Sequence, residues 1–182
     1  MNRQLNFVAY LLLALCALPI AVVSQSVSAK DVVAPAAYAS FDPVARGTAV
    51  QVAVVMKIRP DFHVNAREVS AEYLIPTDLR AEAPTGFQLG EVAYPKGTLR
   101  TFTFSKNKQL NVYTDTVILR LPVKVLASAP VGAQSLTLKL HYQACSTEIC
   151  LPPVTREIPT TINVVAATSA AKPANKEFFT AN

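Results

Sequence analysis

The chain has 182 residues, of which 51% are hydrophobic and 16% are charged, and its formal net charge is +5 at pH 7. Its basic residues are scattered, without the runs or interleaved aromatic side chains of a nucleic-acid-binding surface, so we expect no nucleic-acid partner. The sequence contains no nucleophilic-serine, phosphate-loop or paired-carboxylate motif. Composition and motifs therefore give no support to a hydrolase or a nucleotide-binding protein.

The N-terminal segment has the pattern of a secretory signal peptide. Arg3 precedes an apolar run over 7–23, and a polar stretch then ends in Val27-Ser28-Ala29, with small residues where signal peptidase needs them. We expect residues 1–29 to be cleaved off, which places the protein in the periplasm. The alternative is an uncleaved anchor, since about 17 to 25 apolar residues can span a bilayer. We expect no other contact with the membrane.

The remaining 153 residues fit one domain, which we expect over residues 30–165. A chain of this length buries enough apolar surface to fold without disulfides. Residues 166–182 are rich in Ala, Lys, Pro and Asn and have little apolar patterning. We expect this segment to be a flexible tail.

Apolar and polar residues alternate with period two in segment after segment, which is typical of half-buried strands. The clearest predicted strands cover 50–58, 99–104, 117–125 and 136–142, and shorter ones are expected at 62–65, 72–75, 87–94 and 155–165. Turns rich in Pro and Gly separate them, and no stretch has a convincing helical period. This pattern predicts an all-β fold, an antiparallel β-sandwich of the immunoglobulin-like type.

Two cysteines follow the leader, Cys145 and Cys150. The predicted strand that ends near Tyr142 delivers Cys145 to a loop at one end of the sandwich, and the next strand begins near Thr155. Such a turn can bring the two Cα atoms within the roughly 4.4 to 6.8 Å that a disulfide requires. Pairing of the two cysteines is therefore sterically reasonable.

A structural and a redox-active disulfide both fit this position. Exported proteins often carry structural disulfides, but closing a loop of about six residues removes only about 2 kcal/mol of unfolded-chain entropy, against nearly 5 kcal/mol for a loop of about a hundred. The residues alone leave these two interpretations even. A third is a copper(I) site formed by His141, Cys145 and Cys150, with His63 as a fourth ligand. A fourth is an adhesion or assembly module, a common use of sandwich folds.

The cysteine segment also carries a resemblance to a known family. The strings concerned are Tyr142-Gln143-Ala144-Cys145 and Cys150-Leu151-Pro152-Pro153, together with Phe62-His63-Val64-Asn65-Ala66, Glu72-Tyr73-Leu74-Ile75-Pro76 and Val123-Lys124-Val125. They resemble the N-terminal periplasmic domain of the DsbD-type thiol:disulfide interchange protein, a protein-disulfide reductase, over about residues 37–165. The resemblance implies an immunoglobulin-like domain whose cysteine pair takes electrons from a thioredoxin-like domain and reduces oxidised periplasmic thioredoxin-fold proteins.

In that family a membrane domain and a thioredoxin-like domain follow this one, whereas here the sequence ends after the tail. We therefore expect the electron donor, a thioredoxin-like protein or a membrane reductase, to be a separate polypeptide. Thiol–disulfide exchange requires an accessible thiol and a second thiol that resolves the intermediate. We accordingly expect neither a metal nor an organic cofactor.

By position, the resemblance assigns Cys145 and Cys150 as the catalytic pair, joined in a Cys145–Cys150 disulfide when oxidised, and favours Cys150 as the attacking residue. In the family a loop with an aromatic residue shields the pair. Phe104 is our candidate for that shield, and Tyr142 and His63 are further candidates for shielding or for binding the partner.

Overall fold

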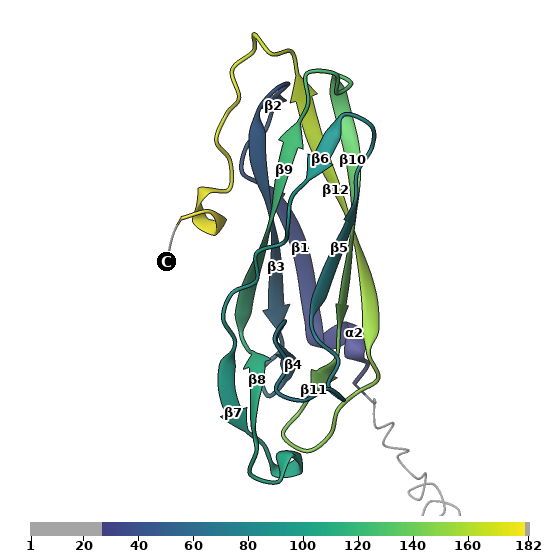
Figure 1. Cartoon of the computed structure of the whole chain (residues 1–182), viewed down its shortest axis with the longest axis vertical. Coiled ribbons are helices and arrows are strands. Elements are labelled where there is room, and N and C mark those ends of the chain that lie inside the picture. The colour runs from purple at the N-terminus through teal and green to yellow at the C-terminus, as the bar shows by residue number, and fades with distance from the viewer. Residues whose placement is uncertain (1–26, 181–182) are drawn as a thin grey trace, which may run out of the picture.

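The computed structural model describes residues 27–180, which form an elongated all-β domain (Figure 1). Its strands assemble into three four-stranded sheets. The predicted signal peptide lies outside the described residues except for residues 27–29. Ser28 caps a short helix, α2 (Ala29–Val32), so the expected cleavage point after Ala29 falls within this helix. Within the described part of the chain, no helix has the length and apolar character needed to cross a membrane.

The first sheet has the strand order β1-β3-β9-β6, and its neighbouring strands are antiparallel. Its strands are β1 (Val33–Ala39), β3 (Ala49–Ile58), β9 (Thr116–Val125) and β6 (Phe87–Leu89). Along β3, alternate residues from Val50 to Ile58 are buried, as the sequence predicts. Ala53 and Val55 on the opposite face are buried as well, so this strand lies inside the molecule on both of its faces.

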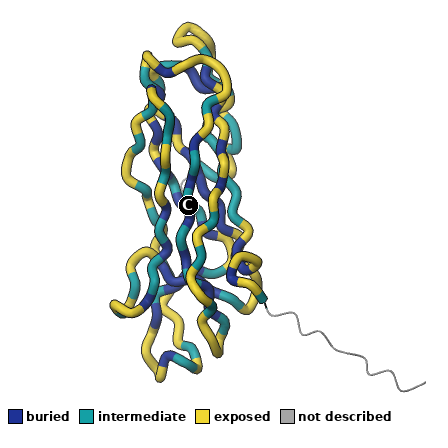
Figure 2. Tube along the Cα trace, turned by 90° about the vertical axis from the view of Figure 1, so that its right-hand side faces the viewer, coloured by how far each residue is buried: buried dark blue, intermediate teal, exposed yellow. Residues whose placement is uncertain are grey.

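The second sheet has the strand order β2-β12-β10-β5. Its strands are β2 (Val44–Ala45), β12 (Val154–Val165), β10 (Gly132–Tyr142) and β5 (Asp78–Glu82). Leu136, Leu138 and Leu140 on β10 are buried and share a core cluster with Val52, Val54 and other residues of the first sheet. Buried positions alternate with exposed ones along both sheets (Figure 2). The predicted immunoglobulin-like β-sandwich is therefore confirmed.

The third sheet lies at one end of the sandwich, at the bottom of Figure 1, with the order β11-β4-β8-β7. Its strands are β11 (Ala144–Cys145), β4 (His63–Asn65), β8 (Gln109–Tyr113) and β7 (Thr98–Thr101). The 3-10 helix η2 (Thr103–Ser105) lies between β7 and β8. A second small apolar cluster supports this end, built from Leu74, Leu110 and Val112 with Phe102 and Phe104 packed against them. Both cysteines lie at this end of the molecule.

Some sequence predictions of strands are wrong in detail. Residues 72–75 form a turn, in which the Leu74 amide donates to the Ala71 carbonyl at 3.1 Å. The apolar side chain of Leu74, which suggested a strand, packs in the second cluster instead. The strand expected over 99–104 ends at Thr101, and that expected over 87–94 ends at Leu89. The strand β1 was not predicted, since its Pro and small Ala residues have low strand propensity.

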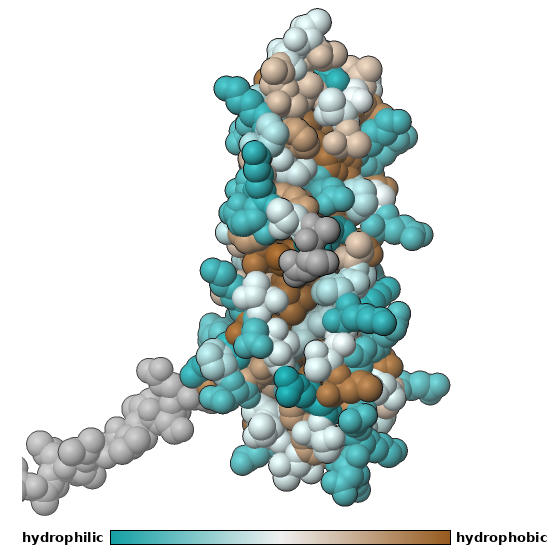
Figure 3. Space-filling view, turned by 90° about the vertical axis from the view of Figure 1, so that its left-hand side faces the viewer, coloured by the Kyte–Doolittle hydropathy of each residue, from teal (hydrophilic) through white to brown (hydrophobic). Residues whose placement is uncertain are grey.

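Part of the C-terminal segment, which was expected to be flexible, packs against the first sheet and the loop after β1, from Lys172 to Phe178. The Asp42 amide donates to the Lys172 carbonyl at 2.9 Å. Within the 3-10 helix η3 (Lys176–Phe178), the Phe178 ring lies 4.5 Å from that of Tyr38, and its carbonyl accepts from Nε of Arg120 at 3.2 Å. Tyr38 and Arg120 flank Ala53 in the sheet register, so this segment covers the outer side of β3. Figure 3 shows this face of the molecule, with patches of hydrophobic residues along its middle and many of the hydrophilic residues towards its edges.

Candidate redox site

Cys145 and Cys150 face each other across a tight hairpin that follows β10. They form an isolated antiparallel bridge. On one side of it the Leu151 amide donates to the Ala144 carbonyl at 2.8 Å, and on the other the Ser146 amide donates to the Ile149 carbonyl at 2.8 Å. Cys145 and Cys150 therefore occupy a position between two hydrogen-bonded pairs.

The structure joins the two cysteines by a disulfide, with an S–S distance of 2.04 Å and a Cα–Cα distance of 3.9 Å. This Cα–Cα distance is shorter than the range of roughly 4.4 to 6.8 Å expected from the sequence. The reason is the hairpin, because antiparallel chains approach most closely at pairs that do not exchange backbone hydrogen bonds.

The turn between the cysteines is held by one side chain. Ser146 Oγ accepts from the backbone amides of Glu148 and Ile149, both at 3.2 Å. The Ile149 side chain is left pointing into solvent, with 61% of its surface exposed. An apolar side chain is therefore displayed immediately before Cys150.

The two sulfur-bearing residues differ sharply in exposure. Cys145 is 1% exposed, whereas Cys150 belongs to the exposed part of the hairpin. Exchange begins when a thiolate reaches one sulfur of a disulfide. Of the two bridged residues, Cys150 is therefore the one that solvent and other molecules can reach.

His63 lies opposite Cys145 in the register between β4 and β11. It is 2% exposed, and burial lowers its pKa from 6.5 to about 4. Its Nε2 atom is buried and has no hydrogen-bond partner in the described part of the chain. The imidazole next to the buried cysteine is therefore neutral at physiological pH and retains unused hydrogen-bonding capacity.

The aromatic candidate for the shield belongs to a stack that begins at His63. The ring of Phe102 lies 3.8 Å from the imidazole, nearly parallel to it, and Phe104 follows at 5.6 Å from Phe102 and 6.2 Å from His63. Phe104 thus lies farther from the imidazole than Phe102, a residue that the sequence analysis did not select. The two phenylalanines are two residues apart in the sequence. This spacing is the one feature from which the sequence could have predicted that both rings lie on the same face.

Tyr142 does not belong to this surface. Its side chain is fully buried, and its hydroxyl donates to the Ala29 carbonyl at 3.0 Å. Burial raises the pKa of this phenol. The structure places Tyr142 in the core, where it ties the end of β10 to helix α2.

An amide network holds the hairpin against β4. Nδ2 of Asn65 donates to the Ile75 carbonyl at 3.0 Å and to Oε1 of Gln143 at 3.5 Å. Nε2 of Gln143 in turn donates to the Leu151 carbonyl at 3.3 Å. These contacts connect the segment after Cys150 to the strand that carries His63, so the two sides of the site are held in fixed relation.

A cavity of about 520 Å³ opens beside the cysteine hairpin and His63. Thr147 of the hairpin and Phe102 contribute to its wall. The charged residues that line it are Arg59, Asp61, Arg100 and Asp115. Two positive and two negative charges leave this cavity without a formal net charge.

The four residues considered for copper(I) do not all come together, because His141 lies apart from His63 and the two cysteines. His141 lies on β10 next to the inward-facing Tyr142, and its Nδ1 is 3.0 Å from Oγ1 of Thr155. Successive residues of a strand point to opposite faces, so this imidazole faces away from the core. Residues 27–180 contain no group of three or more His, Cys, Asp or Glu side chains that could hold a metal ion.

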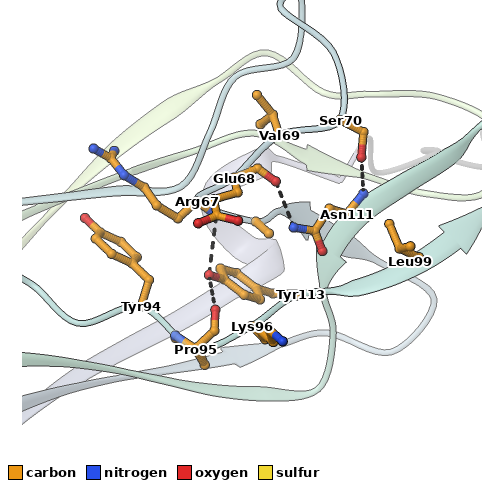
Figure 4. A pocket seen from close by; sticks show the side chains of 12 residues that line it. Arg67, Glu68, Val69, Ser70, Tyr94, Pro95, Lys96, Leu99, Asn111 and Tyr113 are labelled. Atoms are coloured by element: carbon orange, nitrogen blue, oxygen red, sulfur yellow. Dashed lines mark hydrogen bonds between the residues drawn. The ribbon is translucent and has the colours of Figure 1, made fainter.

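A second cavity, of about 650 Å³, lies between the loop after β4 and strand β8 (Figure 4). Several of its polar groups are paired with one another. The Tyr113 hydroxyl accepts from the Arg67 amide at 3.3 Å and donates to the Pro95 carbonyl at 2.8 Å, and Nδ2 of Asn111 donates to the Glu68 carbonyl at 2.8 Å. This network fixes the loop that leaves β4, and so supports the strand that positions His63.

Fold and site together define an immunoglobulin-like domain with a single bridged cysteine pair in a hairpin at one end, a class suited to thiol–disulfide exchange. The family model described as "Thiol:disulfide interchange protein DsbD, N-terminal" matches residues 29–162. The chain therefore belongs to this family, and the resemblance in its sequence is confirmed. Family membership and the Cys145–Cys150 disulfide support a thiol:disulfide exchange module.

The solved structures similar to this chain include two N-terminal domains. The DsbD N-terminal domain of Neisseria meningitidis, in the reduced form, has 19% identity and a TM-score of 0.48, over 81% of this chain and 95% of that one. The N-terminal periplasmic domain of ScsB from Proteus mirabilis has 14% identity and a TM-score of 0.48, over 79% of this chain and 50% of that one. No curated protein sequence matches the chain.

Proposed function

We propose that this domain is a thiol:disulfide relay that acts outside the cytoplasm. It takes two electrons from a thioredoxin-like protein or a membrane reductase and passes them to oxidised thioredoxin-fold proteins. The observation that carries the proposal is the unequal burial of the two bridged cysteines, with Cys145 buried and Cys150 exposed. The signal-peptide pattern of residues 1–29 supports the location.

In the first half of the cycle a thiolate of the donor attacks the Cys150 sulfur. A bond forms between the donor and Cys150, the Cys145–Cys150 bond breaks, and its electron pair stays on the Cys145 sulfur. The donor's second thiol then attacks the donor sulfur of the mixed disulfide. The donor leaves as a disulfide, and both cysteines are reduced.

In the second half the reduced domain acts on an oxidised partner. The Cys150 thiolate attacks the partner's disulfide and forms a mixed disulfide, which releases one partner sulfur. Cys145 then attacks Cys150, so the intramolecular bridge forms again and the second partner sulfur leaves. Two electrons have moved from the domain to the partner.

The surroundings of Cys150 support contact with a protein. Ile149, the preceding residue, exposes its side chain, and a partner that reaches the Cys150 sulfur covers it. The rings of Phe102 and Phe104 lie over His63 on the strand paired with Cys145. In our proposal these two rings are the shield that keeps small oxidants away from Cys145.

Trapping of mixed disulfides with a matched pair of variants tests the proposal. Cys145→Ala keeps the exposed thiol and removes the resolving one, so it should accumulate adducts with thioredoxin-like proteins in the living cell. Cys150→Ala keeps only the buried thiol and should accumulate far fewer. Absence of adducts with both variants, or equal adducts with both, would contradict the assigned roles and leave a structural disulfide.

A further inference from the structure

The relay chemistry described above leaves one buried ionisable side chain at the site without a role. His63 lies opposite Cys145 in the pairing of β4 with β11, is nearly inaccessible to solvent, and has a buried Nε2 with no partner among residues 27–180. An unpaired buried polar atom is costly to the folded state. Its persistence beside a reacting sulfur calls for a chemical explanation.

The resolving step requires a base. Cys145 is buried, and burial disfavours the charged thiolate relative to the neutral thiol. Only the thiolate attacks a disulfide efficiently. Cys145 is 1% exposed, so bulk water has poor access to its proton, and a side chain of the protein must take it.

We propose that the His63 imidazole accepts the proton of the Cys145 thiol when Cys145 resolves the mixed disulfide on Cys150. This inference rests on the proposed function. The S–H proton moves to the imidazole nitrogen, and the Cys145 sulfur forms a bond to the Cys150 sulfur. The bond between Cys150 and the partner breaks, with its electron pair leaving on the partner's sulfur.

The geometry suits this transfer. Side chains of directly opposed residues in an antiparallel pair lie on the same face, with Cβ atoms about 4.5 to 5.5 Å apart. An imidazole extends far enough from its Cβ to reach a sulfur at that spacing. The Phe102 ring, stacked on the imidazole at 3.8 Å, limits the orientations that the imidazole can take.

The electrostatic surroundings permit His63 to change charge during the step. The charged groups lining the adjoining cavity are Arg59, Asp61, Arg100 and Asp115, whose formal charges cancel. Burial keeps His63 neutral, so its imidazole has a free lone pair for the proton. As the thiolate forms beside it, the opposite charge favours the imidazolium. The cavity then gives the proton a path to water.

A single-turnover experiment separates the two steps. The reduced domain is mixed with a symmetrical aromatic disulfide that releases a coloured thiol. Attack by Cys150 releases the first equivalent and resolution by Cys145 the second. His63→Phe, which keeps an aromatic ring in the stack, and His63→Asn, which removes it, should both slow the second phase at least about tenfold. The first phase should change less than about twofold.

The pH profile identifies the base. Without His63, the second-phase rate should follow the thiolate fraction of Cys145 and rise about tenfold per pH unit below the pKa of that thiol, whereas the wild-type profile should be flatter. His141→Asn, which removes the other histidine, should behave as wild type. A second phase of wild-type rate and pH profile in both His63 variants would overturn the inference. A wild-type domain that shows no first phase would instead refute the proposed function.

Discussion

At the scale of single residues, His63 couples folding to pH. Burial lowers its pKa from 6.5 to about 4. Between these values the unfolded chain binds a proton at this position and the folded chain does not, so protonation favours unfolding as the pH falls. The difference between the two pKa values corresponds to about 3 kcal/mol of stability, fully present above pH 6.5 and lost towards pH 4.

We therefore predict that the free energy of unfolding of the oxidised wild-type domain falls more steeply between pH 6.5 and 4 than that of His63→Phe. Denaturant titrations at several pH values measure both slopes. His141 and all carboxylates are present in both proteins, so their contributions cancel in the comparison. Equal slopes would mean that His63 is protonated as readily in the folded state as in the unfolded chain.

The sequence identifies the cysteine pair but not the difference between its members. Cys145 and Cys150 are the only cysteines after residue 29, so their selection needs no three-dimensional information. The burial of Cys145 depends on the pairing of β11 with β4, which joins segments about eighty residues apart in sequence. The role of Phe102 was missed for the same reason, because its ring stacks on His63, which is also distant from it in sequence.

At the scale of elements, the hairpin after β10 presents a small apolar tip. We predict that Ile149→Asp slows reduction of the disulfide by a thioredoxin-like protein about tenfold or more, because covering an isoleucine contributes about 1.5 to 3 kcal/mol. Reduction by a small dithiol, which covers no surface, should be almost unchanged. Rates with the two reductants, measured side by side, separate docking from sulfur chemistry.

The chain offers a matched control for this variant. Val131 is also an exposed aliphatic residue, 54% exposed against 61% for Ile149. It precedes β10, whereas the hairpin follows β10, so the two residues lie at opposite ends of an eleven-residue strand. The disulfide of Val131→Asp should be reduced at the wild-type rate by both reductants. Equal slowing by both variants would indicate a general effect of charge and exclude docking at Ile149.

Strands could be predicted where one face is buried and the other is not. β9 and β10 alternate between buried and less buried residues along almost their whole length, and both were found. The turn at 72–75 was misassigned because the apolar Leu74 packs in the second cluster. The docking of the C-terminal segment could not be predicted, since it depends on Phe178 meeting Tyr38 and Arg120 of two other strands.

At the scale of the whole molecule, most of the contacts that hold the sandwich together lie outside the disulfide. The two large sheets share one continuous apolar core, and the amide network of Asn65 and Gln143 attaches the hairpin to β4. The disulfide closes a loop of only six residues, between positions five apart in sequence. Such a short loop contributes about 2 kcal/mol through the entropy of the unfolded chain, a minor part of a domain's stability of about 5 to 15 kcal/mol.

We therefore predict that reduction lowers the free energy of unfolding by about 2 kcal/mol and leaves the fold intact. Denaturant unfolding followed by far-ultraviolet circular dichroism, with and without a reductant, measures the difference. The Cys145→Ala/Cys150→Ala double variant, which cannot form the bridge, should match the reduced wild type in either condition. Loss of cooperative unfolding on reduction would contradict the prediction. A relay has to present the same docking surface to donor and acceptor, so a scaffold that melts when its disulfide opens could not complete the cycle.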